Sequence, residues 1–150
     1  MTSAIEAYLP HRGMMRLIDR VVMADAECAV AEVDVPFDGL FVQDGAVPAW
    51  IGIEYMAQTI ALWAGARTMR DGGAPCIGFL LGSRRYETHV AAFPGGATLR
   101  VEARCELQAD TGLGMFDCSI ALDGDVVATA RLSVFEPRDA SALTENGVSE

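Results

Sequence analysis

Residues 48–58, with the sequence PAWIGIEYMAQ, decide how this chain folds. Pro48 suits the first turn of a helix, because its missing N–H is no loss there. Apolar and small residues then recur at helical spacing as far as Arg70, and Asp71-Gly72-Gly73 supplies a stop signal. Because the segment is apolar on nearly every side, we expect a helix over residues 48–70 that is buried on most sides.

Glu54 is the one acid within this apolar stretch. A carboxylate in such surroundings must be paired, hydrogen-bonded or protonated, since desolvating a bare charge is very costly. Gln58 lies one helical turn further along, on the same face. We interpret Glu54 and Gln58 as a candidate functional pair, in preference to a buried acid satisfied only by backbone donors.

The sequence on both sides of the helix predicts β-structure. Residues 27–35 and 97–107 alternate polar and apolar with period two, as half-buried strands do. Asp123-Gly124 is a tight hairpin signal. Further strands are expected at 14–24, 76–90, 115–122 and 126–135, with a bend or bulge near Gly78 and Gly82, a loop at 36–47 and a turn at 93–96.

Two strands, one long helix and four strands joined by short turns predict an α+β fold with an antiparallel sheet. The economical way to bury the helix on most sides is to curl that single sheet around it. A second subunit would then cover the sides that the sheet leaves open.

Composition excludes several kinds of function. The net charge of -10 argues against nucleic acid or an anionic membrane as a partner, because both attract a positive surface. All 11 basic residues are arginine, so Schiff-base chemistry and a P-loop lysine are excluded. Four dispersed cysteines and two histidines predict buried reduced thiols and no metal site, and we expect no cofactor.

Two further observations concern location. No segment reaches the roughly 18 consecutive apolar residues that a membrane span needs. The N-terminus carries no basic region followed by an apolar stretch, so the sequence gives no sign of secretion. We therefore expect a cytoplasmic protein.

Three motifs, in order, resemble the β-hydroxyacyl-(acyl carrier protein) dehydratases. Residues 8–21, YLPHRGMMRLIDRV, are similar to the Leu-Pro-His-Arg…Leu-Val-Asp-Arg-Val opening of that family. Pro48 with residues 53–58 is similar to its central-helix motif, Pro-Gly-x-x-x-x-Glu-x-x-Ala-Gln. Phe93-Pro94-Gly95 is similar to its Val-Pro-Gly turn. The resemblance covers about residues 8–135 and implies the hotdog fold.

The domain boundaries follow from the resemblance and from composition. We expect residues 1–136 to form the hotdog domain. Residues 137–150 are polar and without periodicity, so we expect a disordered C-terminal tail.

One departure from the family concerns its catalytic histidine. That residue sits in a Gly-His-Phe-Pro-Gly loop just before the central helix, whereas residues 40–47 here read LFVQDGAV, without histidine. The chain resembles a divergent branch of the hotdog dehydratases, such as those associated with aryl polyene lipid biosynthesis. The family mechanism can be carried over only to Glu54, Gln58 and the N-terminus of the central helix.

The activity that the resemblance implies is dehydration of 3-hydroxyacyl thioesters to trans-2-enoyl thioesters. Glu54 would protonate the departing hydroxyl. Gly52 would permit close approach of the acyl chain or its carrier arm. The thioester oxygen would accept hydrogen bonds from backbone N–H groups at the start of the helix, at Trp50, Ile51 and Gly52.

The motifs carried over from the family do not include the base that removes the α-proton. The Leu-Pro-His segment of the resembling enzymes lines the acyl tunnel, which makes Pro10 a candidate substrate contact and His11 a candidate base facing Glu54. A structural histidine that ties the N-terminal segment to a backbone carbonyl is the alternative for His11. Both interpretations remain open.

The expected partner is a thioester carried by acyl carrier protein or by coenzyme A. Arg12, Arg84 and Arg85 are candidates for a basic patch that contacts the acidic helix of a carrier protein. Arginines that pair with neighbouring acids in solvent are the alternative. The assembly could be a homodimer, a larger oligomer or a heterodimer with another hotdog subunit.

Two other functions compete with dehydration. A hotdog thioesterase could use the helix carboxylate to activate water or to attack the thioester, and it would need no histidine. A non-catalytic hotdog subunit could instead complete the active site of a catalytic partner.

Overall fold

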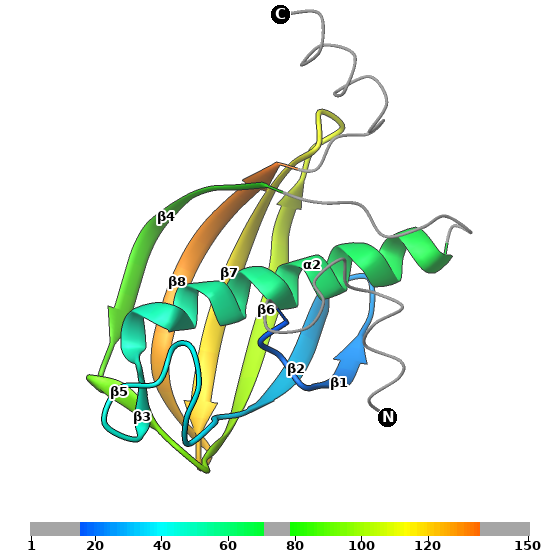
Figure 1. Ribbon diagram of the computed structural model, residues 1–150. Helices are drawn as coiled ribbons and strands as arrows, with labels where there is room; N and C mark the ends of the chain where they lie inside the picture. Colours follow the sequence, from blue (N-terminus) through cyan, green and yellow to red (C-terminus); the bar gives the residue numbers. More distant parts are fainter. Residues whose placement is uncertain (1–15, 71–78, 136–150) are drawn as a thin grey trace, which may run out of the picture.

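The computed structural model describes residues 16–70 and 79–135, and Figure 1 shows one long helix lying across the concave face of a curved sheet. The 3₁₀ turn η2 (Ala49–Ile51) leads into α2 (Gly52–Arg70). Six antiparallel strands form the sheet, in the order β1-β2-β6-β7-β8-β4. Their bounds are β1 Arg20–Ala24, β2 Cys28–Asp34, β6 Thr98–Gln108, β7 Leu113–Leu122, β8 Asp125–Phe135 and β4 Phe79–Thr88. The predicted α+β architecture is confirmed.

The alternating residues of β2 and β6 place their apolar side chains under the helix. Ala31 lies opposite Val101, and Val33 lies opposite Leu99, and all four are buried. Small side chains on this inner face let the sheet approach α2 closely. The buried inner-face residues are Ala29, Ala31, Val33, Leu99, Val101, Ala103, Phe116, Cys118, Ile120, Ala128, Ala130 and Leu132.

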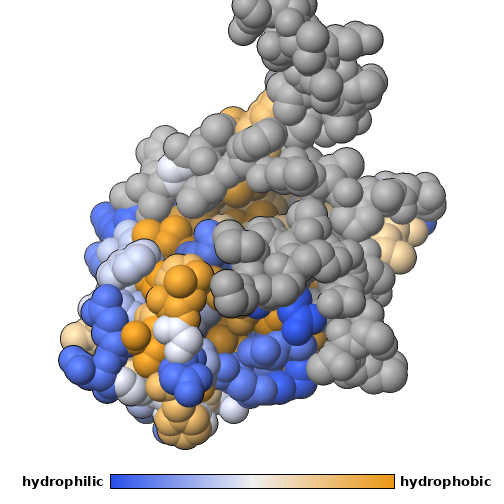
Figure 2. Space-filling view, in the orientation of Figure 1, coloured by the Kyte–Doolittle hydropathy of each residue, from blue (hydrophilic) through white to orange (hydrophobic). Residues whose placement is uncertain are grey.

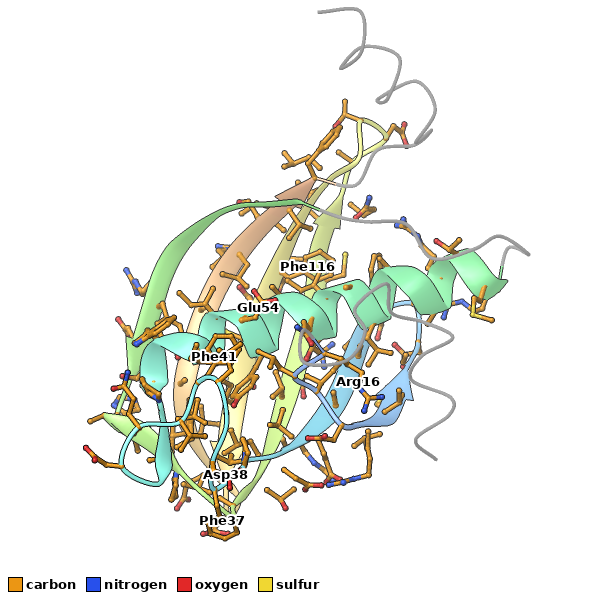
Figure 3. The ribbon with its side chains drawn as sticks, in the orientation of Figure 1. Arg16, Phe37, Asp38, Phe41, Glu54 and Phe116 are labelled. Atoms are coloured by element: carbon orange, nitrogen blue, oxygen red, sulfur yellow. The ribbon has the colours of Figure 1, made fainter. Side chains whose placement is uncertain are left out.

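An aromatic contact fixes α2 against the centre of the sheet. Trp63 of α2 meets Phe116 of β7 edge-to-face, with ring centroids 5.2 Å apart. Figure 3 shows Phe116 between the helix and the sheet. Such pairs contribute about 0.5–1.5 kcal/mol beyond the area they bury.

The Asp-Gly signals mark two-residue hairpins. Asp123 and Gly124, which join β7 to β8, both have positive φ, as the predicted tight turn requires. Asp44 and Gly45 repeat this geometry inside the expected loop, where Gln43 bridges to Ala46. The loop prediction was therefore incomplete: residues 46–48 form β3 (Ala46–Pro48), which pairs with β5 (Ala92–Pro94). Phe93 and Pro94, expected in a turn, belong to β5.

The first strand is shorter than predicted. It begins at Arg20 rather than at residue 14, because the N–H groups of Leu17 and Ile18 donate to the Gln58 side chain and not to a strand. The expected bulge near Gly82 is confirmed by register shifts between β4 and β8. The predicted tail at 137–150 and the glycine at 78 lie outside the described residues.

The long helix is confirmed, but its burial is less complete than expected. Trp50, in η2, is 64% exposed. Along α2, the residues Ile53, Ala57 and Ala61 are only half-buried. Neither η2 nor α2, the helices of the described ranges, is long and apolar enough to cross a membrane.

Candidate functional site

The candidate site lies where α2 begins, on a flank that the sheet does not cover. Ile53, Ala57 and Ala61 recur every four residues and define this open flank. Glu54 borders it and is half-buried. Figure 2 shows hydrophobic surface gathered on the face where α2 begins, and Figure 3 places Glu54 on the N-terminal half of the helix.

The predicted Glu54–Gln58 pair is formed. Gln58 Nε2 donates a hydrogen bond of 3.2 Å to Glu54 Oε1. Glu54 is half-buried, while Gln58 is 0% exposed. Gln58 thus holds the carboxylate at the border between the core and the open flank.

The other end of the Gln58 amide fixes the segment that precedes β1. Its Oε1 accepts a hydrogen bond of 2.8 Å from the Leu17 N–H and a longer one of 3.4 Å from the Ile18 N–H. Buried amides are costly unless hydrogen-bonded, so this pairing accounts for a polar residue in the core. One side chain therefore connects the N-terminal segment to the candidate acid.

The start of the helix has no side-chain cap, since Pro48 supplies none. The Tyr86 hydroxyl of β4 donates instead to the Ala49 carbonyl, which also accepts the Gly52 N–H. A Cβ at Gly52 would overlap the Tyr86 hydroxyl oxygen. Gly52 therefore has a packing role within the chain, and its predicted contact with substrate stays a prediction.

A cleft of about 270 Å³ opens beside this region, between the loop before β3 and the segment before β1. Tyr55, which packs against Phe93 at 5.9 Å, also lines this cleft and is 2% exposed. Burial raises the pKa of Tyr55 to about 12, so its hydroxyl stays protonated. The other residues that line the cleft are Arg16, Leu17, Asp19, Asp34, Pro36, Gly39, Leu40, Phe41 and Val47.

The cleft combines apolar walls with a charged mouth. Asp19 at the mouth accepts a hydrogen bond of 2.7 Å from the Asp34 N–H, and desolvation raises the pKa of the Asp19 carboxyl. Leu40, in the loop that carries histidine in the resembling family, is 65% exposed. Glu54 is not among the residues that line this cleft.

Several predicted site residues lie outside the described part of the chain. These are Pro10, His11 and Arg12, together with the side chain of Arg84. That His11 faces Glu54 therefore stays a prediction. The second histidine of the sequence, His89, is exposed.

Arg85 lies on the outer face of β4 with its side chain 77% exposed. It pairs with Glu87 at 3.8 Å and stands opposite Arg131 of β8. The predicted carrier-protein contact remains untested. Within residues 16–70 and 79–135, no group of three or more His, Cys, Asp or Glu side chains is placed to hold a metal ion.

Tyr86 was not identified from the sequence as a candidate, because it comes from β4 and no local pattern joins it to Glu54. A glycine at the first position of α2 was the available signal, since glycine there needs a reason.

Comparison with known proteins gives consistent results. The model of the ApeP-like family, described as ApeP dehydratase, matches residues 3–145. A 3-hydroxyacyl-[acyl-carrier-protein] dehydratase FabZ from Bordetella petrii is 31% identical over 140 residues, covering 86% of this chain and 90% of the relative. A FabZ from Teredinibacter turnerae is 31% identical over 138 residues, covering 85% and 90%.

Two solved structures are also similar. The dehydratase heterocomplex ApeI:P from Xenorhabdus doucetiae contains a chain with 32% identity and a TM-score of 0.85, covering 94% of this chain and 95% of that one. A hypothetical thioesterase from Streptococcus pneumoniae TIGR4 has 16% identity and a TM-score of 0.62, covering 78% and 84%, which shows the fold alone. The expected hotdog fold is confirmed. On the family match and the FabZ similarity, this chain belongs to the ApeP-like dehydratase family.

Proposed function

We propose that the chain acts in the dehydration of 3-hydroxyacyl thioesters to trans-2-enoyl thioesters in lipid synthesis, with Glu54 as the acid. Membership of a dehydratase family and the similarity to FabZ enzymes support the reaction. The observation that carries the role of Glu54 is its hydrogen bond to Gln58 on the open flank of α2. That bond holds a half-buried carboxyl group near the start of α2.

The elimination needs one base and one acid. A base removes a proton from the α-carbon, and the bond between the β-carbon and its oxygen breaks. Glu54, protonated at the start, gives its proton to the departing hydroxyl, which leaves as water. The base then returns its proton to the Glu54 carboxylate, so the enzyme is unchanged. The N–H groups of Trp50 and Ile51, at the start of the helix, stabilise the negative charge on the thioester oxygen, since the Gly52 N–H already donates to the Ala49 carbonyl.

The base is supplied either by His11 or by a second hotdog subunit. Residues 40–47, the loop in which the resembling family carries its histidine, contain no histidine in this chain. The similarity to a chain of a dehydratase heterocomplex favours the second subunit. We therefore propose a heterodimer in which the partner contributes a histidine opposite Glu54, and keep a homodimer that uses His11 as the alternative.

The surface around the site supports a subunit contact. Leu40 and Trp50 are 65% and 64% exposed, and the open flank of α2 is apolar apart from Glu54. A second subunit placed here would bury these side chains and enclose the carboxyl group. Exclusion of water would strengthen the hydrogen bonds on which the reaction depends.

The carrier of the thioester is proposed to be acyl carrier protein, as the names of the FabZ relatives state for those enzymes. Arg85 is exposed, and an acidic partner would compete with its 3.8 Å pairing to Glu87. Replacement of Arg85 by Glu should raise KM for a carrier-protein substrate and leave KM for the matching coenzyme A substrate unchanged. An equal effect on both substrates would remove Arg85 from the carrier contact.

The test is turnover of a 3-hydroxyacyl carrier protein, followed by mass spectrometry as loss of one water. The chain is assayed alone and after mixing with a histidine-containing hotdog subunit. Water loss only in the mixture supports the heterodimer, and water loss by the chain alone supports His11. Hydrolysis of a saturated acyl thioester without dehydration would identify a thioesterase. Dehydration that survives Glu54→Gln would make the chain a non-catalytic subunit.

A further inference from the structure

The turn η2, which leads into α2, is held by hydrogen bonds from the β4–β5 region. The Ala49 N–H donates to the Ala91 carbonyl at 3.0 Å, next to β5. The Ala49 carbonyl accepts from the Tyr86 hydroxyl of β4. Both backbone groups of one residue are thus fixed by a segment that is distant in sequence. The position of this turn depends on β4, the edge strand of the six-stranded sheet.

Gly52 and Tyr86 are sterically matched. A Cβ at Gly52 would overlap the Tyr86 hydroxyl oxygen and would lie 3.0 Å from Ile120 Cδ1 and 3.2 Å from Phe93 Cζ. Contacts this short are tighter than ordinary van der Waals separations. Because Gly52, the first residue of α2, carries no Cβ, it leaves the space that the Tyr86 hydroxyl occupies.

Tyr86 reaches this position from the inner face of β4. It stands opposite Ala130 of β8, a small buried residue that leaves room for the phenol ring. Desolvation raises the pKa of Tyr86 to about 12, so the hydroxyl remains a hydrogen-bond donor at physiological pH. The Tyr86 hydroxyl can therefore donate to the Ala49 carbonyl at any pH near neutrality.

Glu54 lies between two anchors. The Tyr86 contact fixes Ala49 and Gly52 on its N-terminal side, and Gln58 holds its carboxyl group from one turn further along. We infer that Tyr86 is a positioning residue for the dehydration: its hydroxyl fixes the first turn so that Glu54 and the helix N–H groups meet the substrate in the reactive geometry. This inference rests on the proposed function.

The decisive variant is Tyr86→Phe, because it keeps the ring and removes only the hydroxyl. In the assembled, active form of the enzyme we expect kcat to fall about 10-fold or more, with KM changed less than about threefold, since small displacements of reacting groups cost large factors in rate. A residue that merely stabilised the fold would lower the melting temperature and leave kcat of the folded enzyme unchanged. His89→Ala, at an exposed site just beyond β4, is the matched control and should behave as wild type.

A double variant tests the steric match. Gly52→Ala should displace Tyr86 and reduce kcat at least as much as Tyr86→Phe. Combined with Tyr86→Phe, it meets no hydroxyl, so the double variant should lose no more activity than Gly52→Ala alone. If the loss of kcat in the double variant equalled the product of the two single losses, the two residues would act independently and the steric match would be contradicted. Should Gly52→Ala fail to fold, Tyr86→Phe decides the question without it.

Amide hydrogen exchange supplies a readout that does not need turnover. Tyr86→Phe should accelerate exchange at residues 50–54 about 10-fold and leave the amides of β6 and β7 unchanged. Wild-type kcat in Tyr86→Phe would overturn the positioning role while leaving the proposed function intact. If the wild-type protein dehydrates nothing in any assembly, the proposed function fails, and unchanged exchange at residues 50–54 would then overturn the anchoring as well.

Discussion

Replacement of Gln58 by Leu removes the buried amide that joins α2 to the segment before β1. The change keeps a side chain of similar size in a position that is 0% exposed. The Leu17 N–H loses its acceptor at 2.8 Å, and Glu54 loses the donor at 3.2 Å. An unsatisfied, partly buried N–H costs about 1–3 kcal/mol, and the bond to the half-buried carboxylate adds less. We expect the free energy of unfolding to fall by about 2 kcal/mol in total.

The measurement is urea unfolding at one fixed protein concentration, because subunit association also contributes to stability. A loss of about 2 kcal/mol corresponds to a fall of about 4–8 °C in Tm for a chain of this size. Amide exchange at residues 17 and 18 should accelerate more than exchange in β7. A change below about 0.5 kcal/mol, which is typical of surface substitutions, would refute the argument that this amide holds the N-terminal segment.

A companion variant, Gln58→Glu, separates the two roles of the amide. It keeps an oxygen that can accept from the Leu17 N–H but sets a second carboxyl group against Glu54. Like charges at this distance favour protonation of one carboxyl group, so its pKa in the folded state rises above the unfolded value. The repulsion between the two carboxylates then lowers the stability of the variant at high pH and is relieved as the pH falls. The variant should therefore be less stable at pH 8 than at pH 5. Equal stability at both values would contradict close contact between the two side chains.

Two further predictions concern the scaffold. Arg20 donates to Glu32 and to both carboxylate oxygens of Asp34, and these bonds lower the pKa of each acid below its ordinary value. An acid whose pKa is lower in the folded than in the unfolded state stabilises the fold at pH values above its unfolded pKa. Arg20→Met should therefore lower the free energy of unfolding by about 1 kcal/mol at pH 7, and the difference from wild type should vanish as the pH falls from about 5 to 3. A difference that persists at pH 3 in denaturant titrations would count against the ion pairs. Phe116→Ala, which empties the space beneath Trp63, should lower the free energy of unfolding by about 3–5 kcal/mol. A loss under 1 kcal/mol would show that this contact does not anchor α2.

The sequence was sufficient for the architecture because its periodic patterns are local. Alternation in residues 97–107 and the hairpin at Asp123-Gly124 depend only on neighbouring residues, and both predictions are confirmed. Leu17 and Ile18 were assigned to a strand because an apolar run does not show which element it covers. Their N–H groups pair with a side chain about 40 residues away, which a local pattern cannot indicate.

The candidate site was predictable only where its residues share one helix. Glu54 and Gln58 are four residues apart, so helical geometry alone brings them together. Gly52 was expected to permit close approach of the acyl chain or its carrier arm, which stays a prediction; in the structure the group that approaches it is Tyr86. The helix was expected to be buried on most sides, yet Trp50 just before it is 64% exposed, because a local pattern does not show which residues the sheet covers.

The most direct test compares Glu54→Gln with Glu87→Gln in the assembled enzyme. Both changes remove one carboxylate, but Glu87 is an exposed residue on the outer face of β4. With 3-hydroxyacyl carrier protein as substrate, Glu54→Gln should lower kcat by about 10²–10³-fold without a loss of folding, as expected for removal of a general acid. Glu87→Gln should retain wild-type turnover. Equal and undiminished turnover in both variants would show that the carboxyl group at the start of α2 takes no part in the reaction.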